Sequence, residues 1–221
     1  MFKKFTDKLS RKAKSAVKSG ANRAKSKAKS AVRDAAEDAV ENFVKNAKKV
    51  DKTIKGKVIW DFDTFKSEWE KVASDPVQSV LFFINAAYVY LKDRKTGDAM
   101  VTILIPTPYL NKDPSSPSGF RLNPKGDGYL LMHMAEDGNI VKSYMGGTDK
   151  NNYEIDEDEF EMHVVGLGVD ERSATVIIQS GGKHFNSPVN LKRNNDDQWK
   201  LFNISNIATG VRETEDEKYD F

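Results

Sequence analysis

Small apolar side chains recur along the first fifty residues at the spacing of an α-helix. From Ala13 to Phe43 they stand three or four positions apart, which gives a repeat of eleven residues. This repeat corresponds to about 3.67 residues per turn, close to the 3.6 of an ideal α-helix, so the apolar positions stay on one face. The pattern predicts an amphipathic helix over residues 1–50, with Gly20 as a candidate point at which it is interrupted.

The tip of this helix combines large apolar groups with many cations. Residues 1–33 carry 12 basic side chains and one acidic side chain. The large apolar groups share a face through their i, i+3, i+7 spacing. A helix of this kind is typical of those that lie on an anionic membrane surface. The residues expected to contact a membrane or a phosphate backbone are Phe2, Lys3, Lys4, Phe5, Lys8, Leu9, Arg11, Lys12 and Lys14.

Three other interpretations fit the same basic segment. Its Ala-Lys-Ser composition over residues 24–30 resembles linker-histone tails, in which lysines neutralise nucleic-acid phosphates without reading bases. The basic, serine-rich and acid-poor start also suits a targeting peptide. A solvated tail is the third alternative. Stacking on bases is not expected, because no aromatic residue stands between Leu9 and Phe43.

The hydrophobic pattern after residue 50 predicts helices first. A strand-like or extended entry over residues 55–62 precedes a helix that Asp63 is expected to cap. Asp75 followed by Pro76 predicts the start of a second helix, because the carboxylate can accept a hydrogen bond from the first turn and proline is favoured at its first position. Apolar residues almost all round this second helix indicate that it is buried.

Short alternating segments then predict strands. Asp137-Gly138 is expected to form the tight turn of a hairpin between the first two. Two helices followed by an antiparallel sheet give an α+β fold in which the sheet curls round the second helix. Nuclear-transport-factor and cystatin folds offer an analogy for such a cone-like domain. The expected strands are residues 129–134, 140–144, 160–165, 174–179, 189–193 and 199–204.

Charge divides the chain into a basic and an acidic part. Residues 1–50 hold 15 basic and 5 acidic side chains, and the rest holds 20 basic and 28 acidic side chains. We therefore expect a basic helical arm over residues 1–50, an α+β domain over residues 51–212 and an acidic tail over residues 213–221. The opposite charges also suggest that the arm docks on the acidic run at residues 154–161 of the same chain.

Few residues suggest metal or cofactor chemistry. The chain has no cysteine, which excludes disulfides, thiol catalysis and cysteine-based zinc sites. His133 and His163 stand in predicted strands and would share a face, but they lack a metal-binding spacing. The acidic run at 154–161 does not match an EF-hand loop, and the glycines at 166–168 and 180–182 are typical of turns. We assign no catalytic residue, no metal and no cofactor from the sequence.

An enzyme or a small-ligand-binding protein would need a pocket between the curled sheet and the second helix. Aromatic residues at such positions usually belong to the core. The most apolar stretch, residues 80–91, is shorter than the roughly 20 residues that a membrane-spanning helix needs. The candidate pocket walls are Trp69, Tyr88, Tyr90 and Trp199.

Several short motifs resemble an uncharacterised bacterial domain family over about residues 75–212. They are SYMGGT at 143–148, NNY at 151–153, SGG at 180–182, PVNLK at 188–192, QWKL at 198–201 and VR at 211–212. Met145 replaces an expected aromatic residue, and residues 183–187 replace an expected aspartate and arginine. The resemblance implies a domain boundary and a bacterial cytoplasmic origin. It implies no activity.

Together these patterns predict a non-enzymatic, cytoplasmic adaptor. Its basic helix would tether it reversibly to the inner face of the cell membrane, and its α+β domain would bind an unidentified protein partner. Nucleic-acid binding through phosphate contacts of the same basic arm is the alternative. A small-ligand-binding or enzymatic domain is the third hypothesis.

Overall fold

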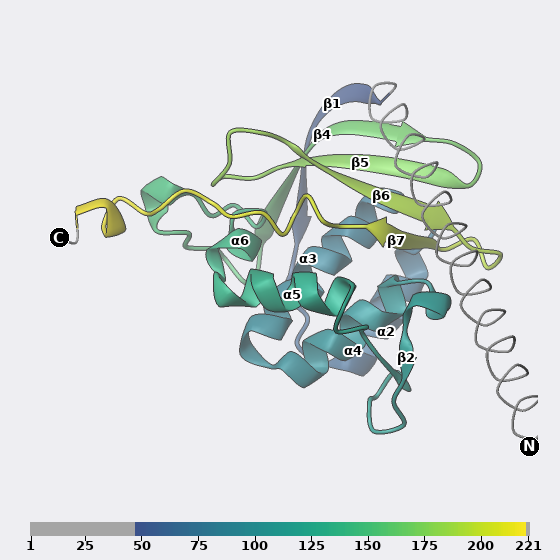
Figure 1. Ribbon diagram of the computed structural model, residues 1–221. Coiled ribbons are helices and arrows are strands. Elements are labelled where there is room, and N and C mark those ends of the chain that lie inside the picture. The colour runs from purple at the N-terminus through teal and green to yellow at the C-terminus, as the bar shows by residue number, and fades with distance from the viewer. Residues whose placement is uncertain (1–46, 220–221) are drawn as a thin grey trace, which may run out of the picture. The chain divides into compact units, whose positions relative to one another are not determined.

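The computed structural model describes residues 47–219, so the predictions for residues 1–46, including the helix and its membrane-contacting tip, lie outside the described residues. The described chain contains five α-helices and a five-stranded antiparallel sheet, which confirms the α+β class (Figure 1). The helices are α2 (Phe62–Val72), α3 (Pro76–Lys92), α4 (Arg94–Leu104), α5 (Asp127–Glu136) and α6 (Asn139–Lys142). The strands of the sheet are β1 (Lys48–Gly56), β4 (Phe160–Val169), β5 (Ser173–Gln179), β6 (Ser187–Arg193) and β7 (Trp199–Asn203).

Smaller elements connect these helices and strands. Three short 3-10 helices are η1 (Thr107–Tyr109), η2 (Asp149–Asn151) and η3 (Glu217–Tyr219). A two-stranded ribbon pairs β2 (Asn111–Lys112) with β3 (Phe120–Arg121). After β7 the chain runs back past α6, so residues far apart in the sequence meet at that end of the domain (Figure 1).

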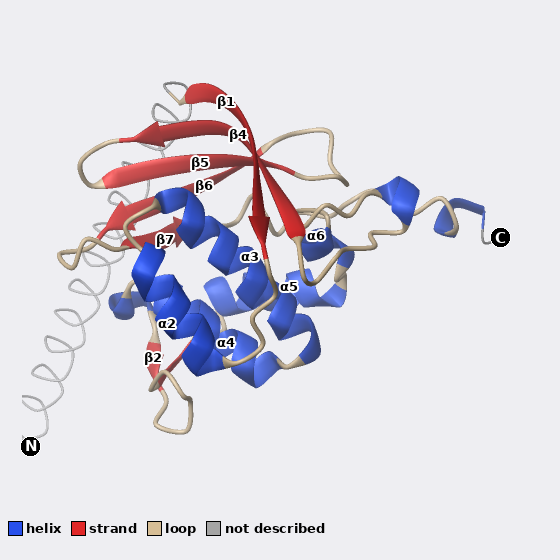
Figure 2. Cartoon of the chain, turned by 180° about the vertical axis from the view of Figure 1, so that it is seen from behind, coloured by secondary structure: helices blue, strands red, loops and turns tan. Residues whose placement is uncertain are grey.

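The sheet buries one face against the helices. Its strand order is β1-β4-β5-β6-β7, so β1 forms one edge although it precedes α2 to α6 of the described residues in the sequence. Alternate residues such as Met162, Val164, Val176 and Ile178 are buried, as the period of two in a strand requires. Figure 2 shows the helices gathered on one side of the sheet, with α3 contacting β1, β5 and β7.

The predicted second helix is confirmed as α3. The Asp75 side chain accepts a hydrogen bond from the N–H of Val77 at 2.8 Å, and Pro76 occupies the first helical position. The helix is apolar nearly all round because it contacts the sheet together with α2, α4 and α5. Among residues 47–219, no helix combines the length and the apolar character needed to cross a bilayer.

Two predicted strands are wrong. Residues 129–134 lie in α5, residues 140–144 lie in α6 and the turn after it, and Asp137 links two helices instead of closing a hairpin. The Asp137 side chain accepts a hydrogen bond from the N–H of Asn139 at 3.0 Å and so supports the start of α6. A short apolar run fits a buried helix turn as well as a strand, and periodicity alone does not separate them.

The start of the domain also differs from the prediction. β1 begins at Lys48, two residues before the expected end of the arm, and ends at Gly56. The cap of α2 is Asp61 and not Asp63, because the Asp61 side chain accepts the N–H of Thr64 at 2.8 Å. The strand-like entry is therefore earlier and longer than the sequence pattern indicates.

Candidate functional site

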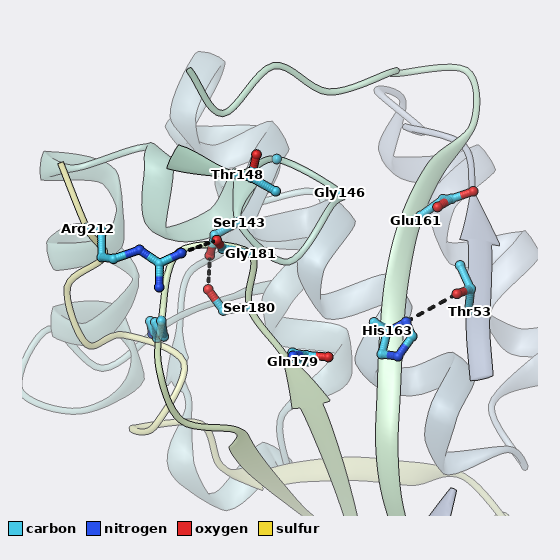
Figure 3. A pocket seen from close by; sticks show the side chains of 12 residues that line it. Thr53, Ser143, Gly146, Thr148, Glu161, His163, Gln179, Ser180, Gly181 and Arg212 are labelled. Atoms are coloured by element: carbon cyan, nitrogen blue, oxygen red, sulfur yellow. Dashed lines mark hydrogen bonds between the residues drawn. The ribbon is translucent and has the colours of Figure 1, made fainter. Parts of the chain in front are cut away.

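The neighbouring strands β4 and β5 separate at one end of the sheet and leave a cavity between them. Their last pair is His163 with Gln179. After Gln179 the chain leaves β5, and the N–H of Gly181 donates to the carbonyl of Ser143 at 2.7 Å. The cavity has a volume of about 350 Å³ and lies beside α6 (Figure 3).

The cavity has two different sides. Thr53 of β1 and Glu161 and His163 of β4 form one side, and Gln179 lies between the two sides (Figure 3). The other side consists of two glycine-containing loops and the C-terminal segment. These supply the lining residues Ser143, Gly146, Gly147, Thr148, Ser180, Gly181, Lys183 and Arg212.

Two buried serines hold the loops together. The Ser180 hydroxyl donates to the Ser143 hydroxyl at 2.7 Å, and Ser143 donates to the carbonyl of Ile140 at 2.8 Å. The N–H of Gly182 donates to the Ser180 hydroxyl at 3.0 Å. Both hydroxyls are therefore used inside the protein and fix the two loops at the cavity wall.

The NNY motif shapes the loop that follows Thr148. Thr148 and Asn151 cap each other through side chain and backbone, which forms η2. Asn152 and Tyr153 then adopt left-handed backbone angles, with φ of 52° and 54°. Tyr153 is fully buried, and its hydroxyl donates to the carbonyl of Arg212 at 2.7 Å, so packing maintains a conformation that tyrosine rarely adopts. Burial raises the pKa of Tyr153 to about 12.

Arg212 joins the C-terminal segment to both loops. Its guanidinium donates two hydrogen bonds of 2.9 Å to the carboxylate of Asp149 and a third, of 3.1 Å, to the carbonyl of Gly181. This bidentate pair lowers the pKa of Asp149 to about 2. The terminal arginine of the family pattern therefore stabilises the site, and most of its donors already have acceptors.

Lys183 is a buried cation at the base of the cavity. Its ammonium donates hydrogen bonds of 2.8 Å to the Tyr144 hydroxyl, the Ile207 carbonyl and the Thr209 hydroxyl. Burial lowers the pKa of Lys183 to about 8 and raises the pKa of Tyr144 to about 12. The ammonium is still protonated at neutral pH, and its three protons point to groups of the protein itself.

His163 lies at the rim between a hydroxyl and a carboxylate. Nδ1 is 3.2 Å from the Thr53 hydroxyl, and Nε2 is 3.0 Å from Oδ1 of Asp51. Both ring nitrogens of His163 therefore have partners within the protein. The Asp51 side chain is 85% exposed, so its charge is screened by water.

The four aromatic residues proposed as pocket walls lie elsewhere. Trp69 and Trp199 are buried in the core, and the indole N–H of Trp199 donates to a backbone carbonyl at 3.0 Å. The buried Tyr88 donates to the Glu157 carboxylate at 2.6 Å, while Tyr90 is partly buried. None of the four lines the cavity between β4 and β5.

The histidine arrangement expected from the sequence is not found. His133 belongs to α5, where it contacts Glu136 at 3.3 Å, whereas His163 belongs to β4. The two therefore do not share a sheet face. Within residues 47–219, no three histidine, aspartate or glutamate side chains gather in a way that would hold a metal ion.

The acidic run at residues 154–161 has partners in the domain. Lys57 contacts Asp158 at 2.8 Å, and Lys55 contacts Glu159 at 2.5 Å. Glu157 accepts the hydrogen bond from Tyr88. Part of the acidic run is therefore already paired, and docking of the basic arm on it stays a prediction.

The sequence indicated only part of this site. The SYMGGT, SGG and VR motifs come from three separate segments, and the structure brings residues of all three to one cavity. Thr53 and Gln179 were missed because an exposed polar residue in a strand is an ordinary feature of a solvated face, and Glu161 was identified only as part of the acidic run at residues 154–161. The only sequence signal for them was their alternation with apolar neighbours.

Comparison with known families matches most of the domain to one family. A family described as a domain of unknown function, DUF6935, matches residues 57–215. No curated protein and no solved structure matches the chain. The match includes the SYMGGT, NNY, SGG and VR motifs and therefore every loop of the cavity wall. The chain belongs to the DUF6935 family.

Proposed function

We propose that the domain is a non-catalytic binding module that holds a small, uncharged, polar ligand in the cavity between β4 and β5. The supporting observation is that the cavity gathers hydrogen-bonding groups from β1, β4, β5, two loops and the C-terminal segment. A cavity of about 350 Å³ has the size of a small-molecule site. Its loops are fixed by internal hydrogen bonds, so binding would require little ordering of the protein.

The internal pairing of charges favours an uncharged ligand. Arg212 donates to Asp149 and Gly181, and Lys183 donates to three groups of the protein. An anion would have to compete with these partners. Glu161 lies 3.9 Å from the Lys55 ammonium, which it shares with Glu159 at 2.5 Å. The Gln179 amide remains for a ligand, and the Thr53 hydroxyl, which is 3.2 Å from Nδ1 of His163, keeps capacity for a further hydrogen bond. An amide and a hydroxyl suit a saccharide or a peptide amide.

Backbone amides at the cavity also favour binding over acyl-transfer catalysis. The N–H of Gly147 donates to the Lys142 carbonyl at 3.0 Å, and the N–H of Gly181 donates to the Ser143 carbonyl at 2.7 Å. An oxyanion site needs free donors aimed at the reacting atom. These two amides would have to break existing hydrogen bonds first, so the His163 array alone does not carry an enzymatic proposal.

Ligand-observed NMR with the full chain tests this proposal. The probes are neutral monosaccharides and capped dipeptide amides, with sugar phosphates as the charged comparison. We expect at least one neutral probe to bind, and Gln179→Ala or Thr53→Val to weaken it about fivefold each, because each removes one hydrogen bond.

Gln78→Ala is the matched control, because Gln78 is a half-buried glutamine on α3 outside the cavity. It should leave binding unchanged. Preferential binding of the sugar phosphates would contradict the uncharged ligand. If a neutral probe binds equally well to the parent chain, Gln179→Ala and Thr53→Val, the ligand site does not lie in the cavity between β4 and β5.

We further propose that residues 1–46 tether this module reversibly to the inner, anionic face of the cell membrane, in a cytoplasmic protein. The support is the sequence. Phe2, Phe5 and Leu9 have the i, i+3, i+7 spacing that would place them on one face of a helix, and residues 1–33 hold 12 basic side chains and one acidic side chain. Shallow insertion of the apolar groups and attraction of the lysines would act together. Phosphate contacts of the same lysines with nucleic acid are the competing function.

Co-sedimentation of the full chain with anionic and neutral liposomes tests the tether. We expect the parent chain to bind the anionic liposomes. The double variant Phe2→Ala, Phe5→Ala should bind them tenfold or more weakly, because it loses roughly the burial energy of two aromatic rings. Phe185→Ala is the control, because Phe185 is a phenylalanine of the domain with 54% exposure.

Duplex DNA as competitor separates the two functions. Membrane binding predicts that DNA displaces the chain poorly and that the double variant still binds DNA. Equal binding of the double variant and the parent chain to anionic liposomes would contradict insertion of the aromatic tip. Preferential capture by DNA would instead favour the nucleic-acid function.

A further inference from the structure

A second cavity lies at the opposite end of β6 from the first. β6 starts at Ser187, whose hydroxyl is 2.6 Å from that of Tyr144, and ends at Arg193 beside the second cavity. The six residue-to-residue steps from Ser187 to Arg193 in an extended strand span about 20 Å. The second cavity has a volume of about 370 Å³ and lies between the η1 segment and the ends of β6 and β7. It is thus a separate site.

The charge of this cavity differs from that of the first. Its lining includes the cations Lys192, Arg193 and Lys200, and no aspartate or glutamate is among the lining residues of the described chain. Neighbouring carboxylates compensate two of these cations. Arg193 pairs with Asp197, and the charge of Asp196 acts on Lys200.

Lys192 is the cation that remains available. Lys200 is partly buried, donates to the Ile103 carbonyl at 2.7 Å and lies 4.1 Å from the centre of the Trp69 ring. The ammonium of Lys192 is 3.9 Å from the centre of the Phe202 ring. Within residues 47–219 it has no carboxylate partner. A cation over an aromatic face retains N–H groups for an anion.

Aromatic surface adjoins this cation. Tyr109 is 51% exposed and meets Phe202 edge to face, with ring centres 6.0 Å apart. Pro106 precedes η1 and Pro108 lies within it, so both restrict the backbone that leads to Tyr109. The ring of Tyr109 therefore offers an exposed flat surface at low conformational cost.

We propose that this second cavity binds a nucleotide, with Lys192 on the phosphate and Tyr109 stacked on the base. The juxtaposition of an uncompensated lysine and an exposed aromatic ring suits a ligand that carries an anion and a planar ring in one molecule. A volume of about 370 Å³ accommodates a ligand of this size. A free nucleotide and a nucleotide within single-stranded nucleic acid present the same chemistry.

Isothermal titration calorimetry of the full chain tests the proposal. The probes are adenosine monophosphate, adenosine, inorganic phosphate and a short single-stranded oligodeoxyadenylate. We expect Lys192→Gln to weaken the binding of adenosine monophosphate about tenfold and to leave the binding of adenosine unchanged. Tyr109→Ser should weaken adenosine monophosphate and adenosine by about tenfold each, because both stack. Lys125→Gln, at an exposed lysine outside the cavity, is the control and should change nothing.

The same titrations identify the source of the nucleotide. Tighter binding of the oligonucleotide, reduced by both substitutions, supports a single-stranded nucleic acid. Equal or tighter binding of the mononucleotide supports a free nucleotide. Failure of both nucleotide probes to bind would overturn the proposal, and so would binding that neither Lys192→Gln nor Tyr109→Ser affects. Inorganic phosphate that binds as tightly as adenosine monophosphate would overturn the role of Tyr109.

Discussion

Replacing Gly181 with alanine is expected to destabilise the domain by about 3 kcal/mol and to abolish ligand binding in the cavity between β4 and β5. A Cβ atom at this position would overlap the carbonyl oxygen of Gly147 and lie 2.9 Å from the Thr148 methyl group. The Gly147 carbonyl belongs to the backbone and cannot move aside as a flexible side chain would. The SGG and SYMGGT motifs would therefore be forced apart, and the cavity wall with them.

Urea unfolding of Gly181→Ala and of the parent chain measures this cost. Gly210→Ala is the matched control, because no atom lies within 4 Å of a Cβ built at Gly210. It should leave stability unchanged or raise it by about 0.4 to 1 kcal/mol, since alanine restricts the unfolded chain. If the two variants unfold at the same urea concentration, the loops do not pack as closely as the structure requires.

Much of the fold follows from local sequence signals. The Asp75-Pro76 pair caps α3, and alternation of apolar residues gives β4, β5, β6 and β7 within a few residues of their ends. These elements bury a continuous or alternating apolar face, so their period is unambiguous. The segments 129–134 and 140–144 are short and apolar on more than one side, and there the strand and helix patterns compete.

The site was harder to predict because it forms where two strands separate. His163 and Thr53 are 110 residues apart in the sequence, and their contact depends on the pairing of β1 with β4. The sequence correctly indicated a turn at the SGG motif. It could not show that the turn packs against Gly147, because that contact depends on the path of the chain after β5. The buried role of Lys183 likewise depends on the distant carbonyl of Ile207.

Asp149→Asn is expected to destabilise the domain by about 2 kcal/mol at neutral pH and by much less in acid. The Asp149 side chain is only 10% exposed and forms a bidentate pair with Arg212. The guanidinium lowers the pKa of Asp149 from 3.8 to about 2 in the folded protein. A difference of this size between folded and unfolded states corresponds to about 2 kcal/mol of stability when the group is ionised.

The sign of the pH dependence follows from the direction of this shift. Because the folded pKa is below the unfolded one, the stabilisation is complete above the unfolded value of 3.8 and is lost as the pH falls through the folded value of about 2. Urea unfolding at several pH values should show the parent chain losing its advantage over Asp149→Asn in that window. Asp63→Asn, at an exposed aspartate of α2, should change stability by less than about 0.5 kcal/mol throughout. If the difference in unfolding free energy between the parent chain and Asp149→Asn stays constant into acid, the ionised pair does not supply this stability. The C-terminal segment would then be held on the loops by the Tyr153 hydroxyl and by the backbone hydrogen bond from Arg212 to Gly182.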